Sequence, residues 1–463
     1  MFVPTPRRTS AKPDWEPRSL ILILALLACA FAGGSSRSDV GALLVLRPLL
    51  VLCIVVLAAL PMGATARGRR LPLIGLSVLA AIIGLQLIPL PPGLWGVLPG
   101  HGPYLEAAAA AGMPQPWRPI SLTPDATWNA LLALLPAFAV LFAVPTLSTR
   151  QLGWVVVAIV GIGCLSALIG VLQISDDTNF QLYRPAHVGA GLLANHNHQA
   201  ALLVCIIPLL RLWTLLPLHN PDRARLRAIV AVGIGFSLVP VMLAVGSRSG
   251  LVLFPIAVLG AALIQPRGLI GGLNRKQGLA IAAAVLVLTI IAVIVTISFG
   301  RAITIGRFAA FDADAELRVT TLPTTLAMAR DFFPFGIGFG AFDPVFRSYE
   351  PDSALHYSYF NHAHNDWLEL LITGGLPAVL LLLVFLGWGV RRARAMYREG
   401  GLGSEVARTG MLIAVLLGLA SITDYPLRTP LLSALFALGC WMMTSSAGAF
   451  SDSNSIRRRR SSH

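Results

Sequence analysis

The chain alternates long apolar runs with shorter polar gaps over nearly its whole length. A helix needs about 20 apolar residues to cross a bilayer, and runs of about that length predict twelve membrane-spanning helices. The predicted spans are residues 19–33, 40–61, 71–90, 128–145, 152–172, 197–217, 228–246, 249–264, 278–298, 366–390, 406–423 and 428–446. The pattern therefore predicts an all-α, polytopic membrane protein.

The composition of the chain agrees with this pattern. Of the 463 residues, 56% are hydrophobic and 12% are charged, whereas a soluble domain carries about 25% charged residues. A net charge of +14 would suggest a nucleic-acid partner in a soluble protein, but here the basic residues lie in the gaps between apolar runs. That placement orients a chain in a membrane, so we expect membrane lipids as partners and no nucleic acid.

The basic residues also predict a topology. With the N-terminus cytoplasmic, 23 of the 35 Lys and Arg residues fall in cytoplasmic segments and 11 in extracytoplasmic ones. Basic residues favour the cytoplasmic side, so both termini are predicted there. The chain then divides into a cytoplasmic tail (1–18), N-terminal helices (19–194), a core (195–446) and a basic tail (447–463). A cleaved signal peptide is the alternative for the N-terminus, but further spans follow at once and favour an uncleaved helix.

The longest polar gap, residues 300–365, is predicted to be an extracytoplasmic loop. Apolar residues at positions 319, 322, 326 and 329 have helical spacing, which predicts an amphipathic helix along the membrane surface. The glycine-rich stretch Pro334-Phe-Gly336-Ile-Gly338-Phe-Gly340 follows without a preceding strand, so we expect a turn and no nucleotide-binding loop. The loop closes with Tyr359-Phe-Asn-His-Ala-His364-Asn-Asp-Trp-Leu-Glu369, where polar groups crowd the lip of a predicted span.

Three residues on the predicted extracytoplasmic side could carry chemistry. Arg248 and Arg318 offer forked donors that match phosphate oxygens, and His364 can exchange a proton near neutral pH. Together they would suit a diphosphate-bearing lipid, with the histidine beside an acceptor hydroxyl. Each also has a structural alternative: an interfacial arginine, a helix-surface charge and a buried histidine, respectively. Asp366 could simply cap the helix that follows it.

Two pairs of histidines raise the question of a metal site. His196-Asn-His198 and His362-Ala-His364 both lie on the predicted extracytoplasmic side, and four imidazoles could hold zinc. Neither pair has i, i+4 spacing and no cysteine lies nearby. We therefore expect no metal and no cofactor.

Three stretches, in this order, resemble the O-antigen ligase and polymerase superfamily. They are Val245-Gly-Ser-Arg248-Ser-Gly250, then Arg318 followed by the stretch 334–342, and then His362-Ala-His364-Asn-Asp-Trp-Leu-Glu369 followed by Gly374-Gly-Leu-Pro377. The resemblance covers roughly residues 195–440. The chain departs from it where family members often have an Asn-Pro-Asn element and this sequence has Asn195-His-Asn-His198.

The resemblance implies a GT-C-like membrane glycosyltransferase that works without a metal. Such an enzyme moves a glycan from undecaprenyl diphosphate to a hydroxyl of lipid A core, another glycan or a protein, on the outer face of the bacterial inner membrane. By this resemblance Arg248 and Arg318 bind the diphosphate, His364 activates the acceptor hydroxyl, and Asn195 and Asn365 contact substrate. A solute transporter is the alternative, although transporters usually place ionisable residues at mid-membrane. These residues do not separate a ligase from a polymerase.

Overall fold

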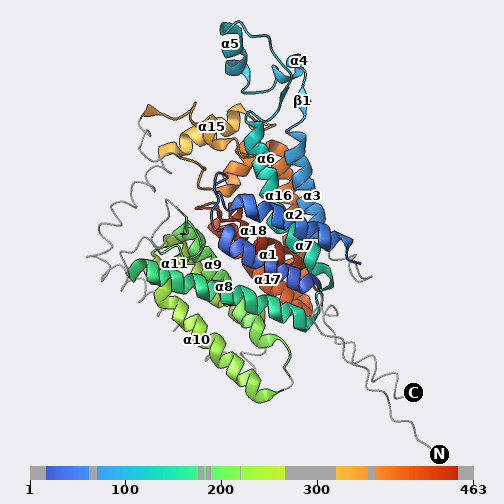
Figure 1. The fold of residues 1–463 in the computed structure, drawn as a ribbon, viewed down its shortest axis with the longest axis vertical. Helices are drawn as coiled ribbons and strands as arrows, with labels where there is room; N and C mark the ends of the chain where they lie inside the picture. The colour runs from blue at the N-terminus through green and yellow to red at the C-terminus, as the bar shows by residue number, and fades with distance from the viewer. Residues whose placement is uncertain are drawn as a thin grey trace, which may run out of the picture.

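The computed structural model describes residues 17–61, 70–175, 182–183, 189–218, 220–265, 320–352 and 360–446. Within these ranges the chain is mostly helical, with almost no strand (Figure 1). Arg318 and the predicted span 278–298 lie outside the described residues, as do the two predicted tails apart from Pro17 and Arg18.

Every predicted span within the described ranges contains a helix, although the span 71–90 ends in a turn and a short strand. These helices are α1 (Pro17–Ala32), α2 (Leu43–Ala59), α3 (Leu71–Leu85), α6 (Pro124–Leu132), α7 (Leu135–Ala143), α8 (Thr149–Ser175), α9 (His196–Leu215), α10 (Pro221–Val245), α11 (Arg248–Ile264), α16 (Asp366–Arg398), α17 (Leu402–Ala420) and α18 (Pro430–Met443). Among the described residues, six helices are long and apolar enough to cross a membrane, and five shorter helices are also apolar. The structure is thus that of an all-α, polytopic membrane protein.

Several helices differ by a few residues from the predicted spans, and two of them extend further for clear local reasons. The span predicted at 128–145 begins at Pro124, which suits the first turn of a helix because that position needs no N–H donor. It continues through α7 into the short 3₁₀ helix η2 (Val144–Thr146). Helix α16 runs past the apolar stretch to Arg398, because arginine and alanine are good helix formers.

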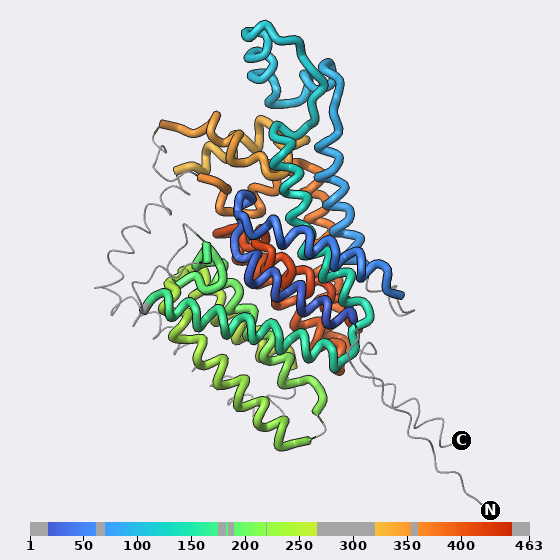
Figure 2. The backbone as a smooth tube through the Cα atoms, viewed as in Figure 1, coloured from blue at the N-terminus to red at the C-terminus, as the bar shows by residue number. Residues whose placement is uncertain are grey.

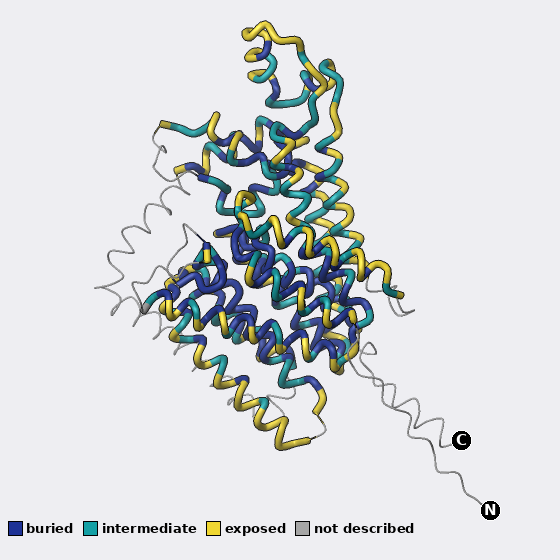
Figure 3. The backbone as a smooth tube through the Cα atoms, in the orientation of Figure 1, coloured by how far each residue is buried: buried dark blue, intermediate teal, exposed yellow. Residues whose placement is uncertain are grey.

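Helix α9 is the centre of the bundle. It packs against α8, α10, α11 and α17, and its buried residues form an almost unbroken run from His198 to Leu210. Figure 3 shows this buried interior beside α10, whose outer surface is exposed. Helix α18 packs against α17 and α7 and joins the N-terminal helices to this core.

The glycine-rich stretch forms the expected turn, and it docks on a kink in α16. Gly336 has a φ of +76°, and a Cβ there would lie 2.6 Å from the Thr373 carbonyl oxygen. Gly375 in α16 has a φ of +59°, and a side chain there would collide with Pro334. Only glycine tolerates both the backbone conformation and the close approach. Backbone hydrogen bonds such as Ile337 N–H to Ile372 O (3.0 Å) close the contact, ahead of the short helix α15 (Phe342–Phe346).

Residues 320–331 form the predicted helix of the long loop. Leu322 and Leu326 are exposed, whereas Met328 and Ala329 are buried against the protein. The apolar positions therefore divide between two faces. The exposed leucines lie where an amphipathic helix would meet lipid.

A small cap stands above the helices at the top of Figure 1. It consists of β1 (Pro89–Leu90), α4 (Pro92–Trp95), α5 (Gly102–Ala110) and β2 (Arg118–Pro119). The strands pair antiparallel, and Trp95 donates a hydrogen bond to the Pro119 carbonyl oxygen (2.8 Å) while Arg118 stacks over its ring. Burial lowers the pKa of His101, which packs edge-on against Trp95.

Four arginines cap helix C-termini at one end of the bundle. Arg18 donates to carbonyl oxygens ending α2 and α7, Arg227 to α9, Arg392 to α18, and Arg408 to α11 and α16. The last carbonyls of a helix have no partner within it and carry partial negative charge. Guanidinium groups therefore suit these positions. We call this the arginine-capped end.

Candidate active site

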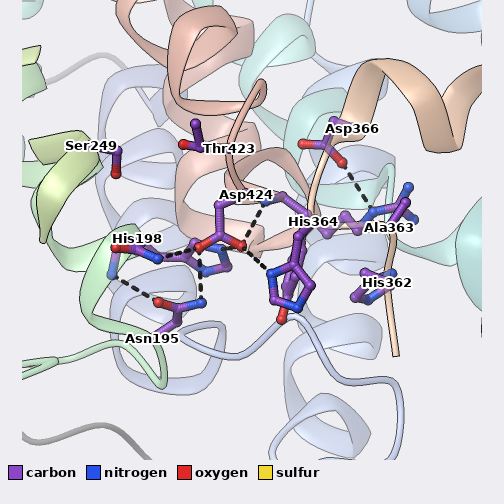
Figure 4. Close-up of polar contacts among 12 residues, drawn as sticks. Asn195, His198, Ser249, His362, Ala363, His364, Asp366, Thr423 and Asp424 are labelled. Carbon is purple, nitrogen blue, oxygen red and sulfur yellow. Dashed lines mark hydrogen bonds and ion pairs between the residues drawn. The ribbon is translucent and has the colours of Figure 1, made fainter. Parts of the chain in front are cut away.

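The opposite end of the bundle carries the candidate site. The loop before α9, the turn between α10 and α11, the loop before α16 and the segment after α17 meet there (Figure 4). Their meeting follows from the alternation of the helices, since α9, α11 and α16 begin at this end and finish at the arginine-capped end. Residues far apart in the sequence thereby form one cluster of polar groups.

His364 and Asp424 form the central pair. The Nδ1 atom of His364 lies 3.5 Å from Oδ1 of Asp424. The histidine side chain is 18% exposed and the carboxylate 3%. His364 has a φ of +48°, a conformation that costs about 1–2 kcal/mol for a residue with a side chain. Nδ1 thus faces a buried carboxylate while the ring remains reachable from outside.

Two asparagines hold Asp424 from the other side. Asn197 donates to Oδ2 of Asp424 at 2.7 Å and Asn195 donates to the same oxygen at 3.2 Å. Ser247, at the start of α11, donates to the Asn197 side-chain oxygen at 2.8 Å and so fixes the orientation of that amide. The Tyr425 backbone N–H donates to Oδ1 at 3.0 Å. These bonds satisfy the buried charge, as a carboxylate in this position requires.

His198 completes this cluster. Its Nδ1 lies 2.8 Å from the Thr429 hydroxyl, and its Nε2 lies 3.9 Å from Asp424. The ring meets Tyr425 edge-on, and Tyr425 also contacts the rings of His362 and His364. Tyr425 therefore separates the three histidines.

A second polar network lies beside the first. His362 Nδ1 is 3.0 Å from Glu369, and Arg428, on the 3₁₀ helix η4 (Pro426–Arg428), lies 3.0 Å from Glu369 and 3.1 Å from Asp366. Glu369 is fully buried and also accepts a hydrogen bond from the Ala363 N–H. Burial opposes the charge on Arg428, but Glu369 and Asp366 outweigh it and hold its pKa above the usual value. The network fastens the segment bearing His364 to the segment bearing Asp424.

Three helix N-termini converge on the site. The side chains of Asn195, Ser247 and Asn365 cap α9, α11 and α16 by accepting backbone N–H donors. Helix N-termini carry partial positive charge and attract anions. Arg248 is the first residue of α11, directly after Ser247. This end of the bundle is therefore suited to a phosphate-bearing ligand.

The structure brings together some of the predicted residues. Asn195 and His364 both approach Asp424, and Arg248 follows the turn bonded to Asn197. Asn365, not Asp366, caps α16, because its oxygen accepts from the N–H groups of residues 367 and 368. Arg318 lies outside the described residues.

Sequence reasoning missed Asp424 and Asn197. Asp424 sits in the short gap between the predicted spans 406–423 and 428–446, where a lone carboxylate at the end of an apolar run was the available signal. Asn197 lies within the stretch Asn195–His198, and nothing in the sequence distinguished it from its neighbours. Its contact with Ser247 depends on packing between α9 and α11 and has no sequence signature.

No metal site of at least three His, Cys, Asp or Glu residues occurs in the part of the chain that the structure describes. The histidines of the two pairs considered as a metal site contact different carboxylates. His198 and His364 face Asp424, whereas His362 pairs with Glu369.

Residues 233–383 match the family model described as O-Antigen ligase. This match supports the resemblance to the O-antigen ligase and polymerase superfamily that the sequence motifs indicate. No curated protein matches the chain. The O-antigen ligase match includes Arg248 and His364, but Asn195, Asn197 and Asp424 lie outside it. Part of the candidate site, including the buried carboxylate, therefore lies in segments outside the matched region.

Proposed function

We propose that this protein transfers a glycan from undecaprenyl diphosphate to an acceptor hydroxyl on the outer face of the bacterial inner membrane. The reaction would contribute to a cell-envelope polysaccharide or lipopolysaccharide. The observation that supports it best is the approach of His364 Nδ1 to the buried Asp424, at a point where three helix N-termini converge. The O-antigen ligase match favours transfer over the alternative of a solute transporter.

Asp424 fixes the tautomer of His364 in this proposal. With its proton on Nδ1, facing the carboxylate, the ring presents an unprotonated Nε2 to the acceptor. Nε2 takes the proton of the acceptor hydroxyl as its oxygen attacks the anomeric carbon of the donor sugar. The bond between that carbon and the diphosphate oxygen breaks, and the electron pair leaves with the diphosphate.

The leaving diphosphate needs charge neutralisation more than protonation. Arg248 and Arg318 supply it as forked donors. Arg248 opens α11, whose N-terminus adds partial positive charge. Asn195 and Asn365, whose side-chain oxygens cap α9 and α16, lie at the same end. The transfer requires no metal in this scheme, because arginines and helix ends carry the developing charge.

The first test measures transfer by purified protein in nanodiscs. General-base catalysis is typically worth about 10²–10⁴-fold in rate, so His364→Ala and Asp424→Asn should each lose most of kcat and still bind donor. His362→Ala is the matched control and should lose less. EDTA should leave activity intact. Activity that EDTA abolishes and zinc restores, with all four histidines equally sensitive, would replace the base assignment by a metal site.

A further inference from the structure

A long groove runs along the bundle, with α3 on one side and α16 and α18 on the other. It has a volume of about 1500 Å³, and residues of α2, α6 and α7 complete its lining. None of the residues of α8 to α11 that the structure describes lines it. The groove is therefore separate from Arg248, and its far end lies well away from the candidate active site.

The two walls of the groove separate toward the arginine-capped end. Near the candidate site they touch, since Ile83 of α3 and Ala378 of α16 belong to one buried cluster. Helix α3 finishes at that end, where the Gln86 side chain donates to a carbonyl oxygen in the early part of α16 at 2.9 Å. Closer to the start of α3, a side chain added at Gly75, or at Gly387 on the facing wall, would meet open space. The open half of the groove is therefore its arginine-capped half.

Apolar side chains line this open half. Phe385 contacts both Trp388 and Phe436, with ring centroids 5.7 and 5.8 Å apart, so aromatic rings of α16 and α18 form one wall. Leu71 and Ile74 of α3 line the facing wall and are exposed. Exposed apolar side chains inside a bilayer are covered by lipid or by protein, and this half of the groove offers room for a chain between its walls.

The length of this half matches one acyl chain. From Leu381 to Arg391, both of which line the groove, α16 advances by about 15 Å at 1.5 Å per residue. One leaflet contributes about half of a hydrocarbon layer that is about 30 Å thick. A lipid in the leaflet at the arginine-capped end can therefore fill this half and stop short of the candidate site.

The groove carries opposite charges at its two ends. The acidic residues that line it belong to the site end and are Asp39, Asp343 and Asp366. The other end is lined by Arg391, which is exposed, and by Arg392. Arg392 donates to two carbonyl oxygens at the end of α18, at 2.8 and 2.7 Å, which fixes its guanidinium and leaves three of its five N–H donors. The N-terminus of α3, where Leu71 lines the groove, adds partial positive charge.

We infer that the arginine-capped half of this groove binds an anionic phospholipid. Its phosphate lies beside Arg391 and Arg392, and an acyl chain runs between α3 and α16. Basic pockets between membrane helices suit the head groups of anionic lipids. The lipid joins α3 to α16 and α18 where the protein leaves them apart. By the predicted topology it belongs to the cytoplasmic leaflet, and its binding does not depend on the proposed glycan transfer.

The exposed arginines of α16 provide a matched pair of variants. Arg391→Gln removes a charge from the groove lining. Arg394→Gln removes the same charge from an exposed arginine of the same helix that does not line the groove. Arg392 stays intact, because it caps α18.

Glycines provide a second pair of variants. Gly387→Trp and Gly75→Trp place an indole in the open half of the groove from facing walls, where each meets open space. Gly75→Trp repeats the test if Gly387→Trp fails to fold. Gly233→Trp in α10 is the matched control, since Gly233 is an exposed helical glycine that also faces open space and does not line the groove.

Native mass spectrometry of the full-length protein in neutral detergent measures binding of phosphatidylglycerol and of phosphatidylcholine with the same acyl chains. The wild type should bind phosphatidylglycerol about tenfold more tightly. Arg391→Gln should weaken this binding about fivefold, as expected for one arginine beside an anionic head group. Each groove tryptophan should weaken it about tenfold, the effect of losing about two buried methylene groups. Arg394→Gln and Gly233→Trp should change it less than about twofold.

Photolabelling locates the bound lipid. Phosphatidylglycerol with a diazirine in one acyl chain should label residues 71–79 and 381–388 of the wild type and lose this labelling in Gly387→Trp. Equal binding of the two phospholipids would mean a crevice filled by any lipid and would overturn the inference. Equal weakening by Arg391→Gln and Arg394→Gln would mean a diffuse basic surface and would also overturn it. So would Arg391-dependent binding of undecaprenyl phosphate without binding of phosphatidylglycerol.

Discussion

His364 occupies a backbone conformation that residues with side chains rarely adopt. Among the described residues, it is the non-glycine residue with a positive φ. Such conformations persist where surrounding contacts enforce them, and they cluster at functional positions. Here the neighbouring Ala363 N–H is fixed by Glu369 and the ring faces Asp424. The strained backbone at His364 is what lets its ring, and not that of His362, face the Asp424 carboxylate.

Because of this strain, we expect glycine at position 364 to give a more stable protein than alanine, the reverse of the usual order for these two residues. His364→Gly should unfold at a higher temperature than His364→Ala, because glycine adopts positive φ freely. After allowance for the greater flexibility of glycine in the unfolded chain, the free-energy difference should be about 1 kcal/mol. Thermal unfolding of both variants in one detergent measures it. The opposite order would show that the conformation at position 364 carries no strain.

Arg248 is predicted to need its planar fork as well as its charge. Arg248→Lys should lower transfer by about 10- to 100-fold, since a charged hydrogen bond is worth about 1.5–3 kcal/mol. Arg330→Lys is the control, because the Arg330 side chain is 82% exposed and pairs with Asp331. Rates measured in the reconstituted assay decide it. Equal activity of the two variants would remove Arg248 from the diphosphate site.

At the scale of elements, Arg428 joins the start of α16 to η4. It contacts Asp366 and Glu369 across more than fifty residues of sequence. Removing one partner of a buried ion pair leaves an uncompensated charge, which costs about 3–5 kcal/mol. This network therefore holds the two segments that carry His364 and Asp424 at a fixed separation.

Arg428→Ala should therefore destabilise the protein by about 3–5 kcal/mol. Arg347→Ala is the control, because Arg347 pairs with Asp343 on the surface with its side chain 58% exposed, and it should cost less than about 1 kcal/mol. Denaturation of both variants in mixed micelles gives the comparison. Similar losses for the two would mean that the buried network contributes little to stability.

The helices could be predicted from the sequence much more fully than the contacts between their ends. Apolar runs of membrane length identify α8, α9 and α10 because the bilayer imposes that length. The pairing of Asn197 with Ser247, or of Asp424 with His364, depends on which helix ends become neighbours. The sequences of the short polar gaps do not indicate which helix ends become neighbours. The family resemblance pointed to His364 and Arg248, while Asp424 emerged only from the packing of α17 against α9.

At the scale of the whole molecule, the arginine-capped end is where the predicted cytoplasmic arginines collect. Arg18, Arg227, Arg392 and Arg408 all lie there, each bonded to carbonyl oxygens at helix ends. Their positions agree with the charge asymmetry counted along the sequence. The residues that are predicted to orient the chain in the membrane thus also cap its helices.

We predict that both chain termini share this side and that the loop 300–365 lies on the other. Single cysteines placed at Ser353 and Ser453 in a cysteine-free protein, probed in intact cells with an impermeant thiol reagent, measure it. Ser353→Cys should be labelled from outside, and Ser453→Cys only after permeabilisation. Labelling of Ser453→Cys but not Ser353→Cys from outside would invert the topology.

The separation of His364 and Asp424 along the chain also affects how the protein is made. A ribosome adds about 5–20 residues per second, so the 60 residues between them take roughly 3–12 s to synthesise. During that interval the histidine exists without its carboxylate, and α17 has yet to enter the bilayer. Under the proposed function, a nascent or truncated chain therefore lacks the oriented base that would act on a lipid-linked glycan. The proposed transfer activity would therefore begin only after α17 and the segment that follows it have been made.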